Sequence, residues 1–433
     1  MTISKPVKAC LVGIGGYGRT YLRAFDELRE DGLTALSAVV VRNPDKYREQ
    51  VRQLEDQGVR CFQDYDEALS DGDFDFVALC VPLQLHRAMT IDALEAGFPV
   101  LCEKSAAPTV QDVLAMMDAQ DRTKLPVDIA YNMQNSSSVR ALQKALIDGC
   151  IGQVRDVVVR GAWLRTDQYY QRSQWAGRAR INDAWTLDGP VNNPLAHYLF
   201  AGLYLGSSSE GHVGDPQQVR GELYRARPTI EGEDTACIEA SLDSGATVYY
   251  YVTLVAPSDN PYRQVTIDIF GDDGSVTWKA GANESPILAT RADGSPVEIE
   301  HEEHPGSTKR ATANFARYLL GESDTLYSPL IDSLRFARVS NGAFDSARQV
   351  HQIPADYVDE QEVPSDTSRP GGDKPTTKAY YLNDIIDMME MAGDRRLLWS
   401  DIGVPWAIKT EPLFVGDYDH FPQAFKPATL PWD

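Results

Sequence analysis

Lys104 and His197 are the residues of this sequence whose chemistry best suits work on a hydroxyl group. Lys104 directly follows the short apolar run Val100–Glu103, and His197 lies in the stretch Thr186–Phe200, TLDGPVNNPLAHYLF. An ammonium group can hydrogen-bond a hydroxyl and stabilise the alkoxide that forms as hydride leaves carbon. An imidazole can accept the hydroxyl proton near neutral pH. Each residue also has a simpler interpretation: Lys104 can pair with Glu103 at a strand end, and His197 can be a buried, hydrogen-bonded helix residue.

Asn193 lies four residues before His197 and is followed by Pro194. Asparagine is a favoured N-cap and proline suits the first helical turn, so we expect a helix to begin here. His197 would then lie one turn in, on the same face as Asn193. An amide cannot ionise, so Asn193 can orient His197 or a hydroxyl but cannot act as a base. We expect both the capping and an imidazole that faces a substrate.

A glycine-rich turn near the N-terminus predicts a dinucleotide site. The run Lys8–Val12 is apolar, GIGGYG follows it, and a helical pattern comes next. In the pattern G-x-G-x-x-G the first glycine permits a tight turn and the second lets the backbone approach a pyrophosphate. The third allows close packing of helix and strand. The helix N-terminus then presents N–H groups to the phosphates. The residues that we assign to the cofactor loop are Gly13, Gly15, Gly16, Tyr17 and Gly18.

Strands and helices continue to alternate after this turn, and they must position these side chains. Strands are expected at Leu36–Val41, Phe74–Cys80 and Val100–Glu103, and helices at Pro44–Gln57, His86–Ala96 and Val110–Gln120. Such alternation implies an α/β fold with a parallel, doubly wound sheet and helices on both faces. Ligands bind these sheets at the carboxyl ends of the strands, where Lys104 is expected to lie.

The end of the second expected strand bears on the choice of cofactor. A carboxylate at this place would bind the adenosine ribose of NAD. The sequence has Val41-Arg42-Asn43 there and no acid. Arg42 can pair with a 2′-phosphate through charge-assisted hydrogen bonds, which tilts the expected cofactor from NAD toward NADP. A solvated surface arginine explains the same residue equally well.

The segment Asp75–Thr109, DFVALCVPLQLHRAMTIDALEAGFPVLCEKSAAPT, resembles the glucose–fructose oxidoreductase / inositol dehydrogenase (Gfo/Idh/MocA) family. Members typically show a strand, a Pro-x-x-x-His turn, a helix and then Glu-Lys-Pro. Here these motifs appear as Pro82 and His86, and as Glu103-Lys104-Ser105, with serine in place of the family's proline. Later family motifs are resembled by Leu146–Val154, Glu231–Ala236 and Ser328–Gln349, so the resemblance covers about residues 7–350.

The resemblance implies an NAD(P)-binding Rossmann domain followed by an α+β domain with a large open, mostly antiparallel sheet. It implies catalytic roles for Lys104 and His197, and it places Asn193 where relatives carry an aspartate beside the histidine. His86 can line the nicotinamide pocket or simply begin its helix. The cofactor-site residues that the resemblance adds are Pro82, His86 and Glu103.

A polar aromatic cluster, Arg165–Trp185, lies just upstream of the histidine. Within it Tyr170, Arg172 and Trp175 combine a hydroxyl donor, a cation and a stacking face. Sugars need that combination, because aromatic faces cover their C–H surfaces and polar groups bind their hydroxyls. We therefore predict substrate contacts for these three residues, with a subunit contact as the alternative.

From Gln153 onward the pattern changes to polar–apolar alternation, as in TACIEASL and QVTIDIF, which favours half-exposed antiparallel strands. The exposed faces need cover, so we expect a homodimer or homotetramer through the open sheet. A polar stretch, 354–378, precedes an aromatic-rich end, which predicts an arm that packs on its own subunit or a neighbour. The predicted domains are 1–128 for the cofactor, 129–353 for substrate and oligomerisation, and 354–433 for the arm.

The composition of the chain limits the kinds of partner that we expect. Lys and Arg number 41 and Asp and Glu 63, so the net charge of −22 argues against nucleic acid. No apolar run approaches the roughly 20 residues that cross a bilayer, and no secretion signal opens the sequence, so we expect a cytoplasmic protein with no membrane partner. The 6 cysteines and 7 histidines show no zinc spacing, and we predict no metal site.

These patterns together predict an enzyme that transfers hydride between NAD or NADP and a carbinol carbon of a sugar, polyol or related carbohydrate. Two alternatives remain. One is glycoside cleavage by NAD-assisted oxidation and elimination, with no net redox change. The other is a non-catalytic sensor that keeps the nucleotide-binding fold.

Overall fold

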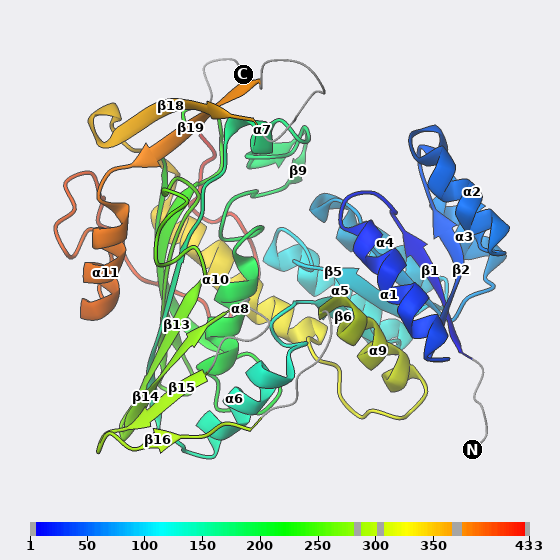
Figure 1. Ribbon diagram of the computed structural model, residues 1–433, viewed down its shortest axis with the longest axis horizontal. Helices are drawn as coiled ribbons and strands as arrows, with labels where there is room; N and C mark the ends of the chain where they lie inside the picture. The colour runs from blue at the N-terminus through cyan, green and yellow to red at the C-terminus, as the bar shows by residue number, and fades with distance from the viewer. Residues whose placement is uncertain (1–5, 281–286, 301–306, 366–374, 429–433) are drawn as a thin grey trace. The chain divides into compact units, whose positions relative to one another are not determined.

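The first compact unit of the chain contains a parallel sheet that starts just before the glycine turn. The computed structural model describes residues 6–280, 287–300, 307–365 and 375–428. The strands of this sheet run parallel in the order β3-β2-β1-β4-β5-β6 (Figure 1). Their bounds are β1 Val7–Val12, β2 Thr34–Val40, β3 Arg60–Phe62, β4 Phe76–Leu79, β5 Val100–Glu103 and β6 Val127–Ala130. The predicted doubly wound parallel sheet is confirmed.

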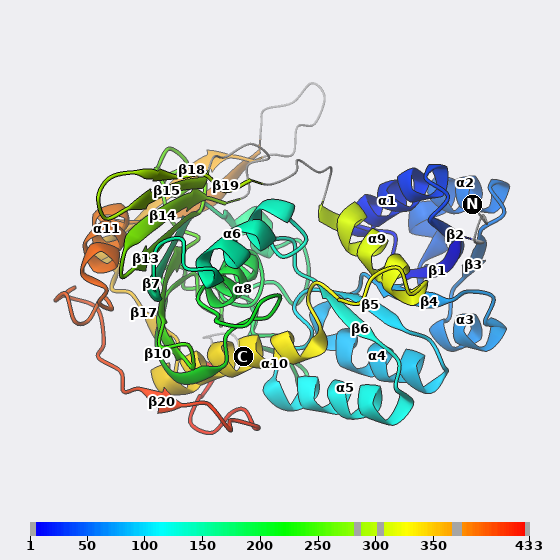
Figure 2. The same ribbon diagram turned by 90° about the horizontal axis from the view of Figure 1, so that it is seen from below.

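Helices cover both faces of this sheet. Figure 2 shows α4 and α5 on one face and α1 and α9 on the other. Phe25 of α1, Phe76 of β4 and Phe315 of α9 are buried in one apolar core. The elements around the sheet are α1 Gly18–Glu30, η1 Pro44–Tyr47, α2 Arg48–Asp56, α3 Tyr65–Asp71, η2 Leu83–Leu85, α4 His86–Glu95, α5 Val110–Thr123 and α9 Ser307–Leu319.

Some elements differ from those expected. The strands β3 and β6 and the helix α3 lie outside the ranges that the sequence predicted. The helix expected over Pro44–Gln57 is divided into η1 and α2. The backbone of Tyr47 departs from helical geometry, with φ −123° and ψ 26°, which accounts for the division.

The chain forms two compact units. The first combines Met1–Ala107, Gln111–Arg140 and His301–Leu334. The second combines Pro108–Val110, Ala141–Glu300 and Arg335–Asp433. The chain therefore returns to the first unit, through α9, after most of the second unit is complete.

The second unit is built on a large mixed sheet that is mostly antiparallel, as predicted. The strand order is β16-β15-β14-β13-β7-β12-β11-β10-β17, and β20 pairs with β10. The central strand β7 pairs in parallel with β12 and antiparallel with β13. The strands are β7 Val154–Ala162, β10 Pro216–Arg225, β11 Thr235–Leu242, β12 Thr247–Thr253, β13 Thr266–Gly271, β14 Gly274–Lys279, β15 Ile287–Arg291, β16 Pro296–Val297, β17 His351–Gln352 and β20 Leu413–Phe414.

One face of this sheet is covered by helices. The helix α8 (Ala196–Leu205) packs on β7 and β12, and Figure 2 shows it on the side of the sheet opposite α11 (Ile385–Arg395). A Cβ at Gly202 of α8 would lie 3.0 Å from side chains of Val159 and Val248, so the missing side chain lets helix and sheet approach closely. The other helices and short strands from this part of the chain are α6 Ser137–Ile147, α7 Asp167–Tyr170, β8 Arg180–Ile181, β9 Ala184–Trp185 and α10 Leu330–Ala347.

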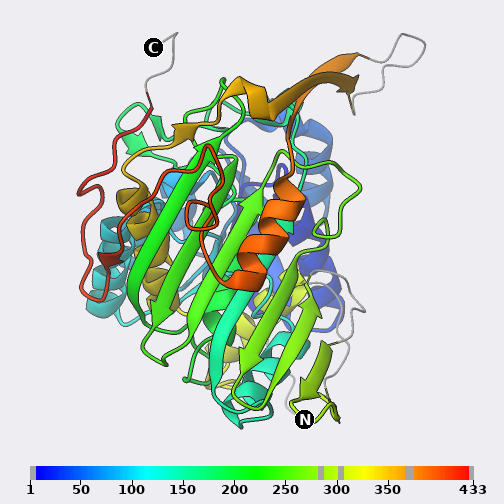
Figure 3. The ribbon, with the colours of Figure 1, turned by 90° about the vertical axis from the view of Figure 1, so that its left-hand side faces the viewer.

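The opposite face is covered by the C-terminal arm, which we define as residues 354–365 and 375–428. It comprises η3 Ala355–Tyr357, the antiparallel pair β18 Val358–Pro364 and β19 Thr376–Leu382, α11, and the segment that follows. Figure 3 shows α11 lying across the sheet. Met389 and Trp399 of the arm are buried in one apolar cluster with Val158 of β7 and Tyr251 of β12. The second face of these strands, which alternation indicated would need cover, is covered by the same chain.

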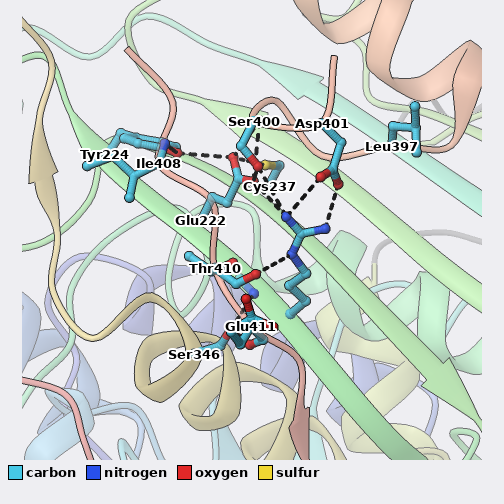
Figure 4. Close-up of polar contacts among 12 residues, drawn as sticks. Glu222, Tyr224, Cys237, Ser346, Leu397, Ser400, Asp401, Ile408, Thr410 and Glu411 are labelled. Carbon is cyan, nitrogen blue, oxygen red and sulfur yellow. Dashed lines mark hydrogen bonds and ion pairs between the residues drawn. The ribbon is translucent and has the colours of Figure 1, made fainter. Parts of the chain in front are cut away.

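A buried polar network also fastens the arm to β10 (Figure 4). Glu222 accepts hydrogen bonds from Ser400 Oγ, at 2.5 Å, and from Tyr224 Oη, at 3.0 Å. Arg220 forms an ion pair with Asp401. Burial raises the pKa of the Glu222 carboxyl, and these hydrogen bonds oppose the rise. The acceptor is thus satisfied by the arm itself, as a buried carboxyl requires.

Within the described ranges, none of the helices is long and apolar enough to span a bilayer. Residues 366–374 of the predicted polar stretch lie outside the described residues. Assembly of copies through the large sheet stays a prediction.

We expect Trp399→Ala to lower the free energy of unfolding by about 3–5 kcal/mol, because it empties a fully buried site. Trp399 is 0% exposed and its ring lies 5.8 Å from that of Trp406 and 5.9 Å from that of Tyr224. Urea unfolding followed by circular dichroism measures the change. Phe414→Ala, at a side chain of the same arm that is 54% exposed, is the control. Equal losses for the two variants would contradict a stabilising role for the packing of the arm.

Candidate functional site

The glycine turn after β1 is sterically closed to larger residues. Gly13 has φ +94°, and a Cβ there would lie 2.3 Å from the carbonyl oxygen of Cys80. A Cβ at Gly18, the first residue of α1, would lie 2.1 Å from the carbonyl oxygen of Gly13. Both contacts are with backbone, so they cannot be relieved by turning a side chain. The turn therefore packs β1, β4 and α1 together at backbone distance, as a dinucleotide turn requires.

The remaining residues of the turn are held differently. Gly15 lies against Tyr47 of η1, whose hydroxyl oxygen would be 2.2 Å from an added Cβ. Gly16 has φ +54° and open space around its Cβ position. Tyr17 is 42% exposed, and its hydroxyl lies 2.8 Å from Thr308 Oγ1 on α9. No local pattern in the sequence indicates this contact between Tyr47 and the turn.

Arg42 and Asn43 follow β2. The side chain of Asn43 accepts a hydrogen bond from the backbone of Lys46 at 3.4 Å and caps η1. Arg42 is exposed, and within the described part of the chain its guanidinium has neither an ion pair nor a hydrogen bond. The cation at this strand end is thus available to a ligand.

His86 is buried between two strand ends. It is the first residue of α4 and is 1% exposed. Its Nδ1 lies 2.8 Å from the carbonyl oxygen of Ser105, and its Nε2 lies 2.9 Å from that of Val81. Burial lowers the pKa of the imidazole, and the two carbonyl contacts oppose that change. The ring connects the segment after β4 to the segment after β5, while Pro82 precedes η2 in the loop between.

Glu103 and Lys104 close β5. The Glu103 carboxyl accepts a hydrogen bond from Tyr21 Oη at 2.9 Å. Burial raises its pKa from 4.5 to about 7, and the Tyr21 hydrogen bond and the Lys104 charge oppose the rise. The peptide between Lys104 and Ser105 is cis. Lys104 therefore stands between a buried carboxyl and a backbone segment that His86 contacts.

The expectation that Asn193 caps a helix is wrong. The helix α8 begins at Ala196, its N-cap is Leu195, and the cap has no side-chain hydrogen bond. The Asn193 amide instead donates to Asp188 Oδ1 at 2.6 Å. A carboxylate is a strong hydrogen-bond acceptor. The Asn193 amide donates to this carboxylate and is not the residue that caps α8.

Asp188 is a residue that the sequence analysis missed. It is 3% exposed, and its Oδ2 accepts a hydrogen bond from the backbone of Gly177 at 2.7 Å. Arg172 Nη2 lies 3.6 Å from the same oxygen. Asp188 thus supplies a carboxylate next to Asn193, the position at which the family resemblance implies an aspartate. Its place inside the stretch TLDGPVNNPLAHYLF was the only available signal.

His197 differs from the other residues of α8. All the others of this helix are buried, whereas His197 keeps part of its surface exposed. The next residue, Tyr198, lines a cavity of about 700 Å³ within the second unit. The partial exposure of His197 favours its substrate-facing interpretation over the core interpretation.

The three predicted substrate residues take different environments. The Arg172 guanidinium lies 3.6 Å from the ring centroid of Tyr169 and 4.8 Å from that of Trp175. Tyr170 instead lies under the guanidinium of Arg227, at 4.8 Å, and burial raises the pKa of its hydroxyl well above the usual value. The structure thus groups Arg172 with Trp175 and Tyr169, and Tyr170 joins this group through an edge-to-face contact with Tyr169 at 5.2 Å.

Lys104 belongs to the first unit, and Asn193 and His197 belong to the second. Their convergence on one substrate stays a prediction. In the described ranges, no group of three or more His, Cys, Asp or Glu residues is arranged to hold a metal ion.

Comparisons with known proteins bear on both units. Residues 7–131 match the family model described as an oxidoreductase family with an NAD-binding Rossmann fold, and residues 139–277 match the GFO/IDH/MocA C-terminal domain. The arm lies beyond both matched ranges.

Two named sugar dehydrogenases match over most of their own length. D-apiose dehydrogenase of Rhizobium rhizogenes is 23% identical over 305 residues, which cover 69% of this chain and 82% of that protein. D-xylose 1-dehydrogenase (NADP+) of Haloarcula marismortui is 24% identical over 303 residues, which cover 69% of this chain and 79% of that protein.

Solved structures share the fold. The WlbA dehydrogenase from Bordetella pertussis, in complex with NADH and UDP-GlcNAcA, matches with a TM-score of 0.66 at 23% identity. The match covers 79% of this chain and 97% of that one.

We expect Glu103→Gln to change how stability depends on pH. A raised folded-state pKa means that the stability present below 4.5 is lost as pH rises through about 7, because ionising the buried carboxyl is costly. The variant lacks this loss, so its unfolding free energy relative to the wild type should increase from about pH 5 to about pH 8. Urea titrations at each pH measure it, and Glu30→Gln, at an exposed position, controls for the lost charge. A difference that stays constant with pH would contradict the assignment.

Proposed function

This chain belongs to the Gfo/Idh/MocA family of NAD(P)-dependent oxidoreductases, and from this membership we propose a substrate class and roles for individual residues. The protein transfers hydride between a nicotinamide cofactor and the CH–OH carbon of a sugar, polyol or related carbohydrate. The named relatives at low identity, a D-apiose dehydrogenase and a D-xylose 1-dehydrogenase, support this class.

The observation that carries the proposal is the partial exposure of His197 on a helix that is otherwise buried, one residue before the cavity-lining Tyr198. Trp163 lines the same cavity and meets Tyr198 edge to face, with ring centroids 6.2 Å apart. Aromatic faces beside polar groups suit the C–H surfaces and hydroxyls of a sugar.

The glycine turn fits the diphosphate of a dinucleotide, since only glycine is compatible with the backbone contacts of Gly13 and Gly18. The N–H groups at the start of α1 would hold the phosphates. The bound nicotinamide supplies the hydride acceptor or donor. The remaining chemistry belongs to side chains of this chain.

In the oxidation direction, the Lys104 ammonium hydrogen-bonds the substrate hydroxyl oxygen and stabilises negative charge on it. The His197 imidazole takes the hydroxyl proton. The carbon that bears this hydroxyl loses hydride, with its electron pair, to the oxidised nicotinamide, so the alcohol becomes a carbonyl. Asn193 orients the substrate or His197, and its own amide is oriented by Asp188. Pro82, His86 and Glu103 shape the backbone beside the nicotinamide. Arg172 and Trp175 are the proposed outer substrate contacts, and Tyr170 is a weaker candidate for such a contact.

Arg42 favours NADP over NAD. Its exposed guanidinium follows β2, the place where a dinucleotide's ribose is bound in this type of sheet. A 2′-phosphate there would form charge-assisted hydrogen bonds with it.

We expect Lys104→Ala and His197→Ala each to lower kcat by about 10²- to 10⁴-fold, since each removes a group that acts on the hydroxyl. Formation of reduced nicotinamide on a panel of sugars and polyols measures this. Lys144→Ala and His420→Ala, at exposed positions, are the matched controls.

Unchanged turnover of the true substrate in Lys104→Ala would contradict the assignment. Sugar cleavage without accumulation of reduced nicotinamide would indicate oxidation and elimination. Tight nucleotide binding with no turnover anywhere in the panel would indicate a sensor.

We expect Arg42→Gln to weaken NADP binding by about 10- to 100-fold, through the loss of charge-assisted hydrogen bonds, and to leave NAD binding nearly unchanged. Fluorescence titration with NADPH and NADH measures both affinities. Arg48→Gln, an exposed arginine nearby that pairs with Asp45, is the control. Equal affinity of the wild type for the two nucleotides would contradict the preference.

A further inference from the structure

The cavity beside α8 contains positive charge that the protein does not neutralise. It lies entirely within the second unit and has a volume of about 700 Å³. Arg165, just after β7, and Arg263, just before β13, both line it, and its lining among the described residues includes no aspartate or glutamate. Within the described residues neither arginine forms an ion pair. This is unusual in a chain of net charge −22.

Neighbouring arginines show the contrast. Arg178 pairs with Glu231, and Arg227 pairs with Asp167. Arg172 lies 3.6 Å from an oxygen of Asp188. Acidic side chains of this region therefore pair with the arginines around the cavity, but not with the two arginines that line it.

Arg165 is held in place by groups that do not use up its donors. Its guanidinium lies 5.0 Å from the ring centroid of Trp163 and 5.0 Å from that of Tyr169. One terminal nitrogen, Nη1, donates to the neighbouring Leu164 carbonyl at 3.2 Å. Nε is buried without a hydrogen-bond partner in the described structure. Stacking orders a guanidinium in advance, which lowers the entropy cost of binding an anion.

Arg263 approaches from a loop that is tied to the same wall. Trp163 Nε1 donates to the Arg263 carbonyl at 2.9 Å, which fastens this loop to β7. The guanidinium itself makes one long contact, from Nη1 to the Ser258 carbonyl at 3.5 Å. Its side chain is exposed, so its charge is accessible from the cavity.

The hydroxyl of Tyr198 adds a neutral donor. The residue is 8% exposed and lines the cavity, and in the described part of the chain its hydroxyl has no hydrogen-bond partner. His197 is its neighbour in α8. The cavity is thus lined from the same turn of α8 that carries the residue we place beside the reacting hydroxyl.

We propose that this cavity binds the oxyanion of an acidic carbohydrate, a carboxylate or a phosphate ester, through Arg165 and Arg263, with Trp163 against the ring of the sugar. An oxyanion accepts the forked hydrogen bonds that guanidinium offers and supplies a counter-charge that neither arginine has among the described residues, whereas a neutral sugar supplies no counter-charge. The inference rests on the proposed function, because it assigns the acid to the substrate of that same site.

Calorimetric titration of the protein saturated with NADP+ tests the proposal without requiring turnover. The probes are matched sets: D-xylose and D-xylonate, and D-glucose with D-glucuronate, D-gluconate and D-glucose 6-phosphate. We expect at least one acid to bind about 10- to 100-fold more tightly than its neutral parent. A carboxylate or a phosphate ester as the tightest binder identifies which oxyanion the cavity prefers. Neutral parents that bind as tightly as every acid would overturn the proposal.

Arg263→Gln should remove the preference for the acid, and Arg263→Lys should retain part of it, because the side chain is exposed and neither change disturbs the core. Arg155→Gln, at the start of the same strand β7 but outside the cavity, controls for the loss of one positive charge. An unaltered preference for the acid in Arg263→Gln would overturn the assignment of the arginine.

The two proposals fail separately. An acid that binds through Arg263 but is never oxidised or reduced keeps the anion site and refutes the proposed function. Turnover of neutral sugars alone, with acids neither bound nor converted, keeps the proposed function and refutes the anion site.

Discussion

The contact of the buried His86 imidazole with two backbone carbonyls is the constraint on which the cofactor side of the site depends. It joins the segments that follow β4 and β5, at Val81 and Ser105. The carbonyl of Cys80, one residue before Val81, lies where a Cβ on Gly13 would collide. The glycine turn, the β4 end and Lys104 are thus parts of one packed backbone junction, and each is positioned by the others.

Acidic and basic side chains are separated among the residues that we propose for the site. Glu103 is a carboxyl whose pKa burial raises to about 7, and it adjoins Lys104. Asp188 is buried beside Asn193 and receives its amide. The cavity that Tyr198 lines, in contrast, has two arginines and no acid among its described lining residues. Two cations in one cavity, without ion pairs in the described part of the chain, create a local field that attracts an anion.

The C-terminal arm changes what the large sheet needs. Strands β7, β10, β11 and β12 contribute residues to an apolar cluster that α11 and the residues after it complete. The polar network around Glu222 then ties the arm to β10. Since the matched family ranges end at residue 277, this cover is supplied by a part of the chain outside them. The apolar area that would otherwise meet solvent or a partner is buried within one chain.

Local periodicity and the order of motifs along the chain predict the parallel sheet, the glycine turn, the mostly antiparallel second sheet and the family. The strands β3 and β6 were not predicted from these patterns. The three-dimensional structure was needed to show that Asn193 donates to Asp188 instead of capping α8, and that Arg165 and Arg263 line one cavity. Hydrogen-bond partners and uncompensated charges depend on residues brought together from distant segments, and no local pattern records them.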